Sequence, residues 1–351
     1  MRVLVAPLNW GLGHASRCIP LVTRFLRAGD DVVLAGDGEA LLLLRRHFPN
    51  LPYYKLASLN LRYSSGNSQV WAMLRASVRL VCFSFRDHKL LNELLSRQYF
   101  DLVVSDNRFG LFTKRTRCAY ITHQLLIPLP QRFKRIERPL QKLHYAVIRH
   151  YQECWVPDNE KEPYLAGRLS HPSVLPQNVR YIGPLSRFED IAAVHSPSSE
   201  FDVVAVLSGL EPQRTLFEEQ ITEEWYGKQE RVLVVRGLPS APSMVTKRGN
   251  ITYKPILADA ELASVLLGAK VIISRSGYSS LMDYYSLGLT RKAQRGEIEL
   301  RLVPTAGQPE QEELELEFNR LLLRDGEKHR LYRQTFSDVL NSECRHSMPT
   351  L

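Results

Sequence analysis

The chain has 351 residues, of which 44% are hydrophobic and 24% charged, so it is long enough for two domains and has the composition of a folded globular protein. Its five cysteines are odd in number and widely spaced, which argues against a disulfide framework or a zinc knuckle and for a reducing cytoplasm. The net charge of +9, from 46 Lys and Arg against 37 Asp and Glu, favours anionic partners, but no zinc pattern, helix-turn-helix or RNA-binding signature supports nucleic acid.

The first half of the chain alternates short apolar segments with helical patterns. Residues 2–6 are apolar and β-branched, as in a buried parallel strand, and are too few for a secretory signal. A Gly-rich turn, a helical pattern that Gly29 closes and a second strand at 31–35 follow, and this start predicts a doubly wound unit with a right-handed crossover. Further strands of the same sheet are expected at 101–105, 119–122 and 154–157.

Basic and apolar residues are interleaved at near-helical spacing in 131–149, where Pro139 starts or kinks the helix. This segment fits equally well a helix with a solvated basic face and a surface that rests on anionic lipid headgroups. No apolar run in the sequence approaches the roughly 18 residues of a membrane-spanning helix. We therefore expect any membrane contact to be peripheral.

Proline and glycine cluster between residues 172 and 184, where no clear periodicity remains, and a Ser-Pro-Ser-Ser run follows at 196–199. We interpret this region as the approach to a hinge. The pattern restarts beyond it, with strands expected at 202–207, 231–235, 270–274 and 299–303 and helices at 212–221, 259–267, 279–287, 310–323 and 327–340.

The sequence therefore predicts an α/β protein with two Rossmann-like, doubly wound domains that face a cleft. The N-terminal domain is expected at 1–185, the hinge at 186–200, the C-terminal domain at 201–340 and a flexible tail at 341–351. Ligands of such sheets bind at the carboxyl ends of the strands, so the cleft between the two halves is the expected site.

The turn after the first strand has the sequence NWGLGHASR over residues 9–17. Its glycines allow the backbone to turn sharply and approach a ligand, and the N-terminus of the next helix favours negative charge. The third glycine of a dinucleotide fingerprint is missing, because His14 follows Gly13, so the turn gives little support to NAD binding. A lone histidine is usually structural, but His14 stands at a strand end beside the expected cleft, where an imidazole can transfer protons.

Three turns in the second half repeat the arrangement of strand, small-residue loop and helix. They are Ser208-Gly209, the SRSGYSS segment at 274–280 and the PTAGQPEQE segment at 304–312. Each alone fits an ordinary capped helix at least as well as a binding site. Together they predict peptide N–H groups and helix dipoles that hold a diphosphate. Asp283 lies one turn past the second loop, where its carboxylate can accept two ribose hydroxyls or complement the helix dipole.

The order of these motifs resembles that of GT-B glycosyltransferases. The resemblance rests on the Gly-Leu-Gly-His-Ala-Ser-Arg start, the mid-chain hinge, the Ser-Arg-Ser-Gly turn with an acid soon after, and the Pro-Thr-x-Gly-Gln-x-Glu-Gln segment. Segments 101–110 (DLVVSDNRFG), 120–125 (YITHQL) and 181–188 (YIGPLSRF) are similar to the same subgroup. The sequence most resembles bacterial family 1/28-like enzymes, including the lipid-intermediate N-acetylglucosaminyltransferase of peptidoglycan synthesis and diacylglycerol glucosyltransferases, and does so over nearly the whole chain.

The resemblance implies a set of donor-binding residues. Asp283 matches an acid that holds the donor ribose, although the family often has Glu there. Gln311, helped by Glu310, matches a glutamine that contacts sugar hydroxyls. Arg187 matches a basic residue near the phosphates, and Arg275 a cleft residue near the nucleotide. The full implied set is Gly13, Arg187, Ser208, Gly209, Arg275, Ser276, Gly277, Asp283, Glu310 and Gln311.

The implied activity is transfer of a hexosyl or N-acetylhexosaminyl group from a nucleotide-diphosphate donor, expected to be UDP-linked, to a lipid or glycan hydroxyl. We expect inverting attack without a metal or other cofactor, because no Asp-x-Asp stands at a strand end and no nucleophile suggests a covalent route. His14 is the expected base and Asp106 the reserve. The link between Gly288 and Pro304 is several residues longer than in the family, which leaves the wall around the base or sugar undefined.

Two other functions fit the same pattern. A non-hydrolysing nucleotide-sugar epimerase shares the fold and would act on the donor without an acceptor. A non-catalytic nucleotide-sugar or lipid-binding protein would need a cleft but not the pairing of His14 with Asp283. The expected location is the cytoplasm, with segment 131–149 as a candidate contact with the inner face of a membrane.

Overall fold

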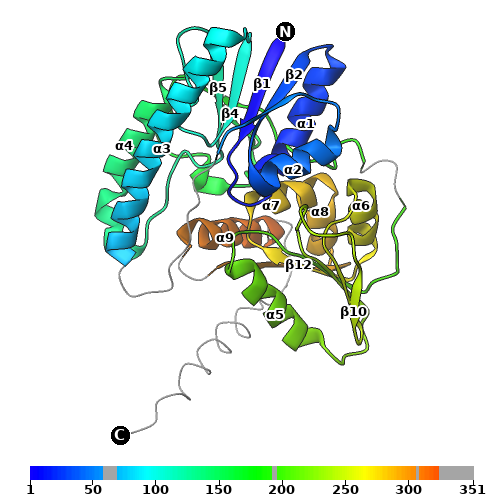
Figure 1. Cartoon of the computed structure of the whole chain (residues 1–351). Helices are drawn as coiled ribbons and strands as arrows, with labels where there is room; N and C mark the ends of the chain where they lie inside the picture. The colour runs from blue at the N-terminus through cyan, green and yellow to red at the C-terminus, as the bar shows by residue number, and fades with distance from the viewer. Residues whose placement is uncertain (58–68, 192–195, 306–307, 324–351) are drawn as a thin grey trace, which may run out of the picture.

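The computed structural model describes residues 1–57, 69–191, 196–305 and 308–323. It contains two α/β domains, one above the other in Figure 1, each built on a central sheet with helices on its faces. The predicted fold class, two Rossmann-like domains, is confirmed. The helix expected at 327–340 and the tail expected at 341–351 lie outside the described residues, as does part of the predicted hinge, 192–195.

The N-terminal sheet has the strand order β3-β2-β1-β4-β5-β6-β7 within the described residues, and all its strand pairs are parallel. The strands are β1 (Arg2–Pro7), β2 (Asp31–Gly36), β3 (Tyr53–Lys55), β4 (Leu102–Asp106), β5 (Arg117–Ile121), β6 (Glu153–Val156) and β7 (Val179–Tyr181). The helices are α1 (Gly13–Arg27), α2 (Gly38–His47), α3 (Gln69–Arg97) and α4 (Glu137–Ile148), with short 3-10 turns η1 (Gln131–Ile136) and η2 (Gly167–Leu169).

Strand β1 shows why this sheet is covered on both faces. Val3 and Val5 belong to the hydrophobic cluster that includes α1 and α2, whereas Leu4 and Ala6 belong to the cluster that includes α3 and α4. All four side chains are fully buried, because successive residues of a strand point to opposite faces. Figure 1 shows the two helix pairs on opposite sides of the sheet.

The C-terminal sheet has the strand order β10-β11-β9-β8-β12-β13 in the part of the chain that the structure describes. Its strands are β8 (Val203–Val206), β9 (Val232–Val235), β10 (Thr246–Arg248), β11 (Ile251–Lys254), β12 (Val271–Arg275) and β13 (Glu299–Val303), of which β10 alone runs antiparallel to its neighbour. Its helices are α5 (Gln213–Trp225), α6 (Asp259–Gly268), α7 (Tyr278–Ser286), α8 (Leu289–Gln294) and α9 (Pro309–Leu323).

Several elements were not evident in the sequence, and most of them are short. Strand β7 has three residues inside the segment 172–184 that predicted only a hinge approach, and three residues show no periodicity. The long link after Gly288 contains α8, which begins after a glycine in the left-handed conformation, with φ of 71°. Segment 131–149 divides into η1 and α4, and Pro139 lies in the first turn of α4, where its missing N–H costs nothing.

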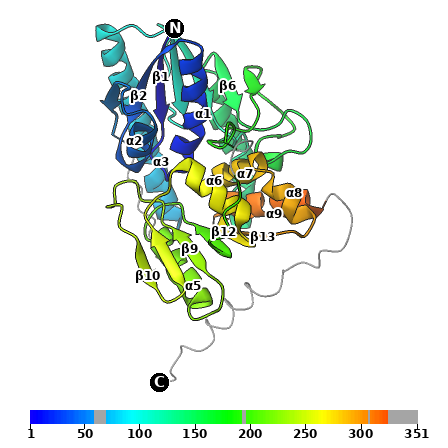
Figure 2. The ribbon, with the colours of Figure 1, turned by 90° about the vertical axis from the view of Figure 1, so that its right-hand side faces the viewer.

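The two domains meet along α1 and α7. The Ser279 hydroxyl of α7 donates to the Gly13 carbonyl of α1 at 2.8 Å, and the Tyr278 hydroxyl donates to the Pro157 carbonyl at 2.6 Å. One hydrophobic cluster is continuous across the contact and contains Val3 of β1 and Leu281 of α7. Figure 2, turned by 90°, also shows α6 and α7 at the junction of the domains. The start of α7 therefore lies against the start of α1.

Candidate active site

The carboxyl ends of neighbouring strands deliver the predicted residues from both domains. In the N-terminal sheet, β1, β4 and β5 are neighbours, and they are followed or ended by His14, Asp106 and His123. In the C-terminal sheet, β8, β12 and β13 are neighbours, and they lead into α5, α7 and α9. Because parallel strands end at one edge of a sheet, the three helix N-termini are neighbours there.

His14 and Asp106, both predicted as catalytic, are in direct contact. The His14 Nδ1 atom lies 2.8 Å from Asp106 Oδ1, and the His14 side chain is 12% exposed whereas Asp106 is fully buried. Arg17, one turn further along α1, donates from Nε to Asp106 Oδ2 at 2.6 Å and from Nη2 to Oδ1. The structure thus places a partly exposed histidine against a fully buried carboxylate.

The charge state of Asp106 follows from its partners. Burial alone would raise the pKa of Asp106, but its interactions with Arg17 and His14 outweigh burial and hold that pKa well below its usual range. A fully buried carboxylate that stays ionised is a poor proton acceptor. In this structure the Asp106 carboxylate is occupied by Arg17 and His14, and its role as the reserve base stays a prediction.

His123 and Arg17 are site residues that the sequence analysis did not single out. His123 Nδ1 lies 3.2 Å from Arg17 Nη1, and His123 Nε2 lies 2.9 Å from Glu310 Oε1, at the start of α9 in the other domain. The His123 ring stacks on Tyr278 of α7, with centroids 4.3 Å apart. Two sequence signals exist, the three-residue spacing of His14 and Arg17 on one helix and the position of His123 just after a strand, but neither indicates contact.

The turn between β12 and α7 holds a buried hydroxyl group that has no partner. Ser276 is 1% exposed, and its Oγ has no hydrogen bond within the part of the chain that the structure describes. Gly277 is the N-cap of α7 and carries no side chain that would cover this turn. Because buried polar atoms are nearly always hydrogen-bonded, this hydroxyl leaves a hydrogen-bonding position unfilled beside a helix N-terminus.

Arg275 ties the loops of the C-terminal domain together. Its guanidinium donates to the carbonyls of Gln213 and Pro304 at 3.2 Å and 3.4 Å, and it lies 4.0 Å from the centre of the Phe217 ring. Burial lowers the pKa of Arg275 to about 10, so the side chain stays cationic at neutral pH. A positive charge therefore lies between the loops that precede α5 and α9.

The remaining C-terminal residues lie in tight turns. Gly209 has a φ of +101°, a backbone conformation that favours glycine. A Cβ atom added to Gly11 would lie 3.5 Å from the Cα atom of Gly209, so the turns after β1 and β8 pack against each other. The Gln311 side chain accepts from the Thr305 N–H at 2.8 Å, which caps its own loop. Ser208 precedes Gly209 in the turn before α5.

Asp283 and Arg187 come together, but at the hinge side of α7. The Asp283 carboxylate accepts from the Ser186 hydroxyl at 2.6 Å and lies 3.4 Å from Arg187 Nε. Arg187 also donates to Asp259 at 3.3 Å, and Asp259 contacts His47 Nε2 at 2.8 Å. Both Asp283 oxygens are thus engaged by the protein itself, so the ribose contact implied for Asp283 stays a prediction that requires these contacts to exchange.

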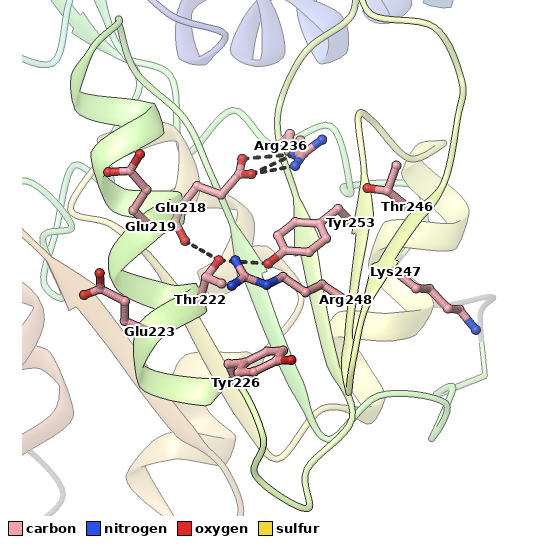
Figure 3. A pocket seen from close by; sticks show the side chains of 10 residues that line it. All are labelled: Glu218, Glu219, Thr222, Glu223, Tyr226, Arg236, Thr246, Lys247, Arg248 and Tyr253. Carbon is pink, nitrogen blue, oxygen red and sulfur yellow. Dashed lines mark hydrogen bonds and ion pairs between the residues drawn. The ribbon is translucent and has the colours of Figure 1, made fainter.

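A cavity of the C-terminal domain lies away from these residues. It has a volume of about 620 Å³, and Figure 3 shows it between α5 and the strands of the C-terminal domain. Its lining residues are Glu218, Glu219, Thr222, Glu223, Tyr226, Arg236, Thr246, Lys247, Arg248 and Tyr253. None of the predicted site residues lines it.

In the part of the chain that the structure describes, no group of His, Cys, Asp and Glu side chains is arranged to hold a metal ion. No helix in that part is long and apolar enough to cross a membrane.

Comparison with known proteins gives a likeness in structure alone. No family model and no curated protein matches the sequence. The solved glycotransferase of kitacinnamycin is 13% identical, with 98% of this chain and 89% of that chain covered and a TM-score of 0.57.

Other similar structures were solved with a nucleotide bound. The glycosyltransferase SsfS6 of Streptomyces sp. SF2575, complexed with thymidine diphosphate, is 12% identical, covers 93% of this chain and 86% of its own, and has a TM-score of 0.51. LpCGTa in complex with UDP is 12% identical, with 92% of this chain and 82% of that chain covered and a TM-score of 0.52. At such identities the likeness concerns the fold. The chain therefore has the two-domain GT-B fold found in these glycosyltransferases.

Proposed function

We propose that the chain is a glycosyltransferase that moves a sugar from a nucleoside-diphosphate donor, UDP-linked in the first instance, to an acceptor hydroxyl with inversion. One observation carries the proposal. The start of α7, where the Ser276 hydroxyl is buried and unpaired, is joined to the start of α1, which carries the His14–Asp106 pair. A site for a phosphate oxygen and a candidate base thus lie at one junction between the domains.

The proposed reaction uses the groups on the two sides of the junction. Asp106 accepts a hydrogen bond from the Nδ1–H group of His14, which leaves the Nε2 lone pair free to take a proton from the acceptor hydroxyl. The acceptor oxygen forms a bond to the anomeric carbon while the bond from that carbon to the diphosphate breaks. The electron pair leaves with the nucleoside diphosphate, whose charge is stabilised by the N-termini of α5 and α7 and by Arg275.

The donor can be identified by a thermal-shift screen of the whole chain against UDP, TDP, GDP and their common sugar conjugates. A ligand present at about 100 times its Kd adds roughly 2.7 kcal/mol to the free energy of unfolding, which is readily detected. The best donor is then incubated alone and with hydroxyl acceptors. Transfer only in the presence of an acceptor supports the proposal, conversion of the donor alone indicates an epimerase, and binding without turnover indicates a non-catalytic protein.

Substitution His14→Ala tests the assignment of the base. We expect kcat to fall by about 10²- to 10⁴-fold, the usual contribution of a general base, while the Kd for UDP stays within about threefold of the wild-type value. His150→Ala is a matched control, because His150 is an exposed histidine of the same domain. Full turnover by the His14 variant would remove His14 from the mechanism.

We further infer that the acceptor is carried by a membrane lipid. The proposal is supported by the outer surface of η1 and α4, where Ile136 and Leu143 are 51% and 64% exposed. The exposed basic side chains Lys134, Arg135, Arg138 and Lys142 belong to the same two elements. Apolar side chains within a basic face are typical of a surface that rests on anionic headgroups.

Co-sedimentation with vesicles tests this surface. The wild-type chain should bind vesicles of phosphatidylcholine that contain about 30% of the anionic lipid phosphatidylglycerol. This binding should be lost when the salt concentration is raised. The double variant Arg138→Glu with Lys142→Glu should bind at least about tenfold more weakly, because each basic residue near the surface contributes about 1 kcal/mol. Arg248→Glu, an exposed arginine of the C-terminal domain, is the control. Equal binding by the double variant and the control would exclude α4 as the contact.

A further inference from the structure

The series of contacts that begins at His14 does not end at Asp106 but continues through Arg17 and His123 into the other domain. We propose that His123 is a positioning residue that couples Glu310 of the C-terminal domain to the alignment of the His14–Asp106 pair through Arg17. This inference rests on the proposed function, because it concerns the same candidate base. It adds a residue from the YITHQL segment that the predicted mechanism does not use.

The contacts form an unbroken series across the domain junction. Glu310 Oε1 lies 2.9 Å from His123 Nε2, and His123 Nδ1 lies 3.2 Å from Arg17 Nη1. The Arg17 guanidinium binds Asp106 through Nε and Nη2, and Asp106 Oδ1 lies 2.8 Å from His14 Nδ1. Arg17 is 2% exposed and His123 4% exposed, so water competes little for these bonds.

The chemistry of the guanidinium fixes the protonation of His123. Arginine can only donate hydrogen bonds, so His123 Nδ1 must accept from Arg17, and the ring proton must lie on Nε2. That proton is then correctly placed to donate to the Glu310 carboxylate. Burial lowers the pKa of His123, which agrees with a neutral ring in this tautomer. Glu310 and Arg17 thus hold the two nitrogens of one ring.

The orientation of Arg17 in turn decides the tautomer of His14. Arg17 Nη2 and Asp106 Oδ1 both lie 2.8 Å from His14 Nδ1. With Nη2 turned toward Asp106, Nδ1 carries the proton and donates to the carboxylate, and Nε2 is free to act as a base. With Nη2 turned toward Nδ1, that atom accepts and the proton moves to Nε2, where it blocks proton transfer. His123 accepts from Nη1 of the same rigid, planar guanidinium and thereby helps to keep the Nε and Nη2 donors paired with Asp106, which favours the first arrangement.

Glu310 connects this series to the donor side of the cleft. It is the second residue of α9, next to Gln311, and its side chain is 39% exposed while it contacts His123. Burial would raise the pKa of Glu310, but the hydrogen bond from His123 lowers it, so the group is an anionic acceptor at neutral pH. Contact with Glu310 requires the domains to be as close as they are here. Closure therefore aligns His14 through His123.

Two substitutions separate the two contacts of His123. In His123→Asn the side-chain oxygen can take the place of Nδ1 and accept from Arg17, but nothing reaches Glu310. In His123→Gln the amide can reach Glu310, but the acceptor for Arg17 is lost. Coupling needs both bonds, so we expect each variant to lower kcat by about 10- to 100-fold, the range for a misplaced catalytic group. The Kd for UDP should stay within about threefold, and His150→Asn should change neither.

A spectroscopic measurement tests the alignment without relying on turnover. In the full chain labelled with ¹⁵N-histidine, we expect wild-type His14 to carry its neutral-state proton on Nδ1 and His123 to carry it on Nε2. Both His123 variants should give His14 as a mixture of tautomers. An unchanged His14 spectrum in both variants, wild-type kcat in either one, or a wild-type His123 protonated on Nδ1 would overturn the proposal.

These readouts separate the two ideas. If the wild-type chain transfers no sugar, the proposed function fails, while the ¹⁵N spectra still decide whether His123 positions Arg17 and His14. If a variant does not fold, as judged by circular dichroism and UDP binding, the wild-type tautomers of His14 and His123 remain the deciding result.

Discussion

Asp283 is a buried carboxyl group whose oxygens face the hinge residues Ser186 and Arg187. Burial raises the pKa of Asp283 from an ordinary 3.8 to about 6, although Arg187 and the Ser186 hydroxyl partly oppose the shift. The folded protein therefore binds this proton more tightly than the unfolded chain does. The stabilisation is complete below about pH 4 and is lost as the pH rises through about 6.

Substitution Asp283→Asn should remove this pH dependence. Asparagine keeps an acceptor oxygen for Ser186 but no longer carries a charge that must be buried. Between pH 4 and pH 6 the free energy of unfolding should fall by about 1–3 kcal/mol more in the wild type than in the variant. Urea unfolding at several pH values measures the difference. Asp190→Asn, at an exposed carboxyl, should follow the wild-type curve, and parallel curves for Asp283→Asn would contradict the assignment.

At the scale of elements, the predicted hinge is held in place on both sides of residues 192–195. Before them, Phe188 is fully buried, and after them the Ser198 N–H donates to the Ser264 carbonyl of α6 at 2.9 Å. The last residue of α6, Gly268, lies so close to this segment that a Cβ on it would meet the Ser198 carbonyl oxygen at 2.0 Å. The end of α6 thus needs glycine because of a neighbouring backbone.

Substitution Gly268→Ala should destabilise the protein by about 1–3 kcal/mol, because backbone must move to admit the methyl group. In an open helix position the same change would stabilise by up to about 1 kcal/mol, so the sign of the effect is informative. Thermal or urea unfolding measures it. Gly288→Asn serves as the comparison, since that glycine has open space around it and asparagine tolerates a left-handed backbone. A stabilised Gly268 variant would mean that the hinge does not pack on α6 in this way.

At the scale of the whole molecule, side chains from the two domains meet at titratable contacts. His47 ends α2 of the N-terminal domain, and its Nε2 lies 2.8 Å from Asp259 at the start of α6. Burial lowers the pKa of His47 and Arg187 opposes protonation, but the bond to Asp259 outweighs both, so the net shift is upward. The contact is therefore strongest below about pH 6.5, the unfolded-state value, and weakens as the pH rises through the raised pKa.

This contact predicts a pH-dependent separation of the domains. In the chain without ligand, the radius of gyration measured by small-angle X-ray scattering should increase as the pH is raised from 6 to 8, because a contact worth about 1 kcal/mol is lost. His47→Gln should show no such change over that range. His150→Gln, at an exposed histidine away from the junction, should behave as the wild type. A pH-independent radius in the wild type would show that other contacts determine closure.

The fold class could be predicted from the sequence, because it is encoded locally. Apolar runs such as 2–6, helical periodicity and the small-residue turns after strands each depend on a few neighbouring residues, and together they predicted two doubly wound sheets. The position of His14 was also predictable, because its place after the first strand fixes which edge of the sheet it occupies. Elements of three residues, such as β3 and β7, escaped because they are too short to show a period.

The contacts between distant side chains could not be predicted from the sequence. Asp283 and Arg187 were both expected at the donor, yet the structure pairs them at the hinge, since α7 turns the carboxylate toward Ser186. His123 and Glu310 are 187 residues apart in sequence and 2.9 Å apart in space. Such contacts depend on how two separately folded sheets are placed against each other, and a pattern read along one chain segment contains no information about that placement.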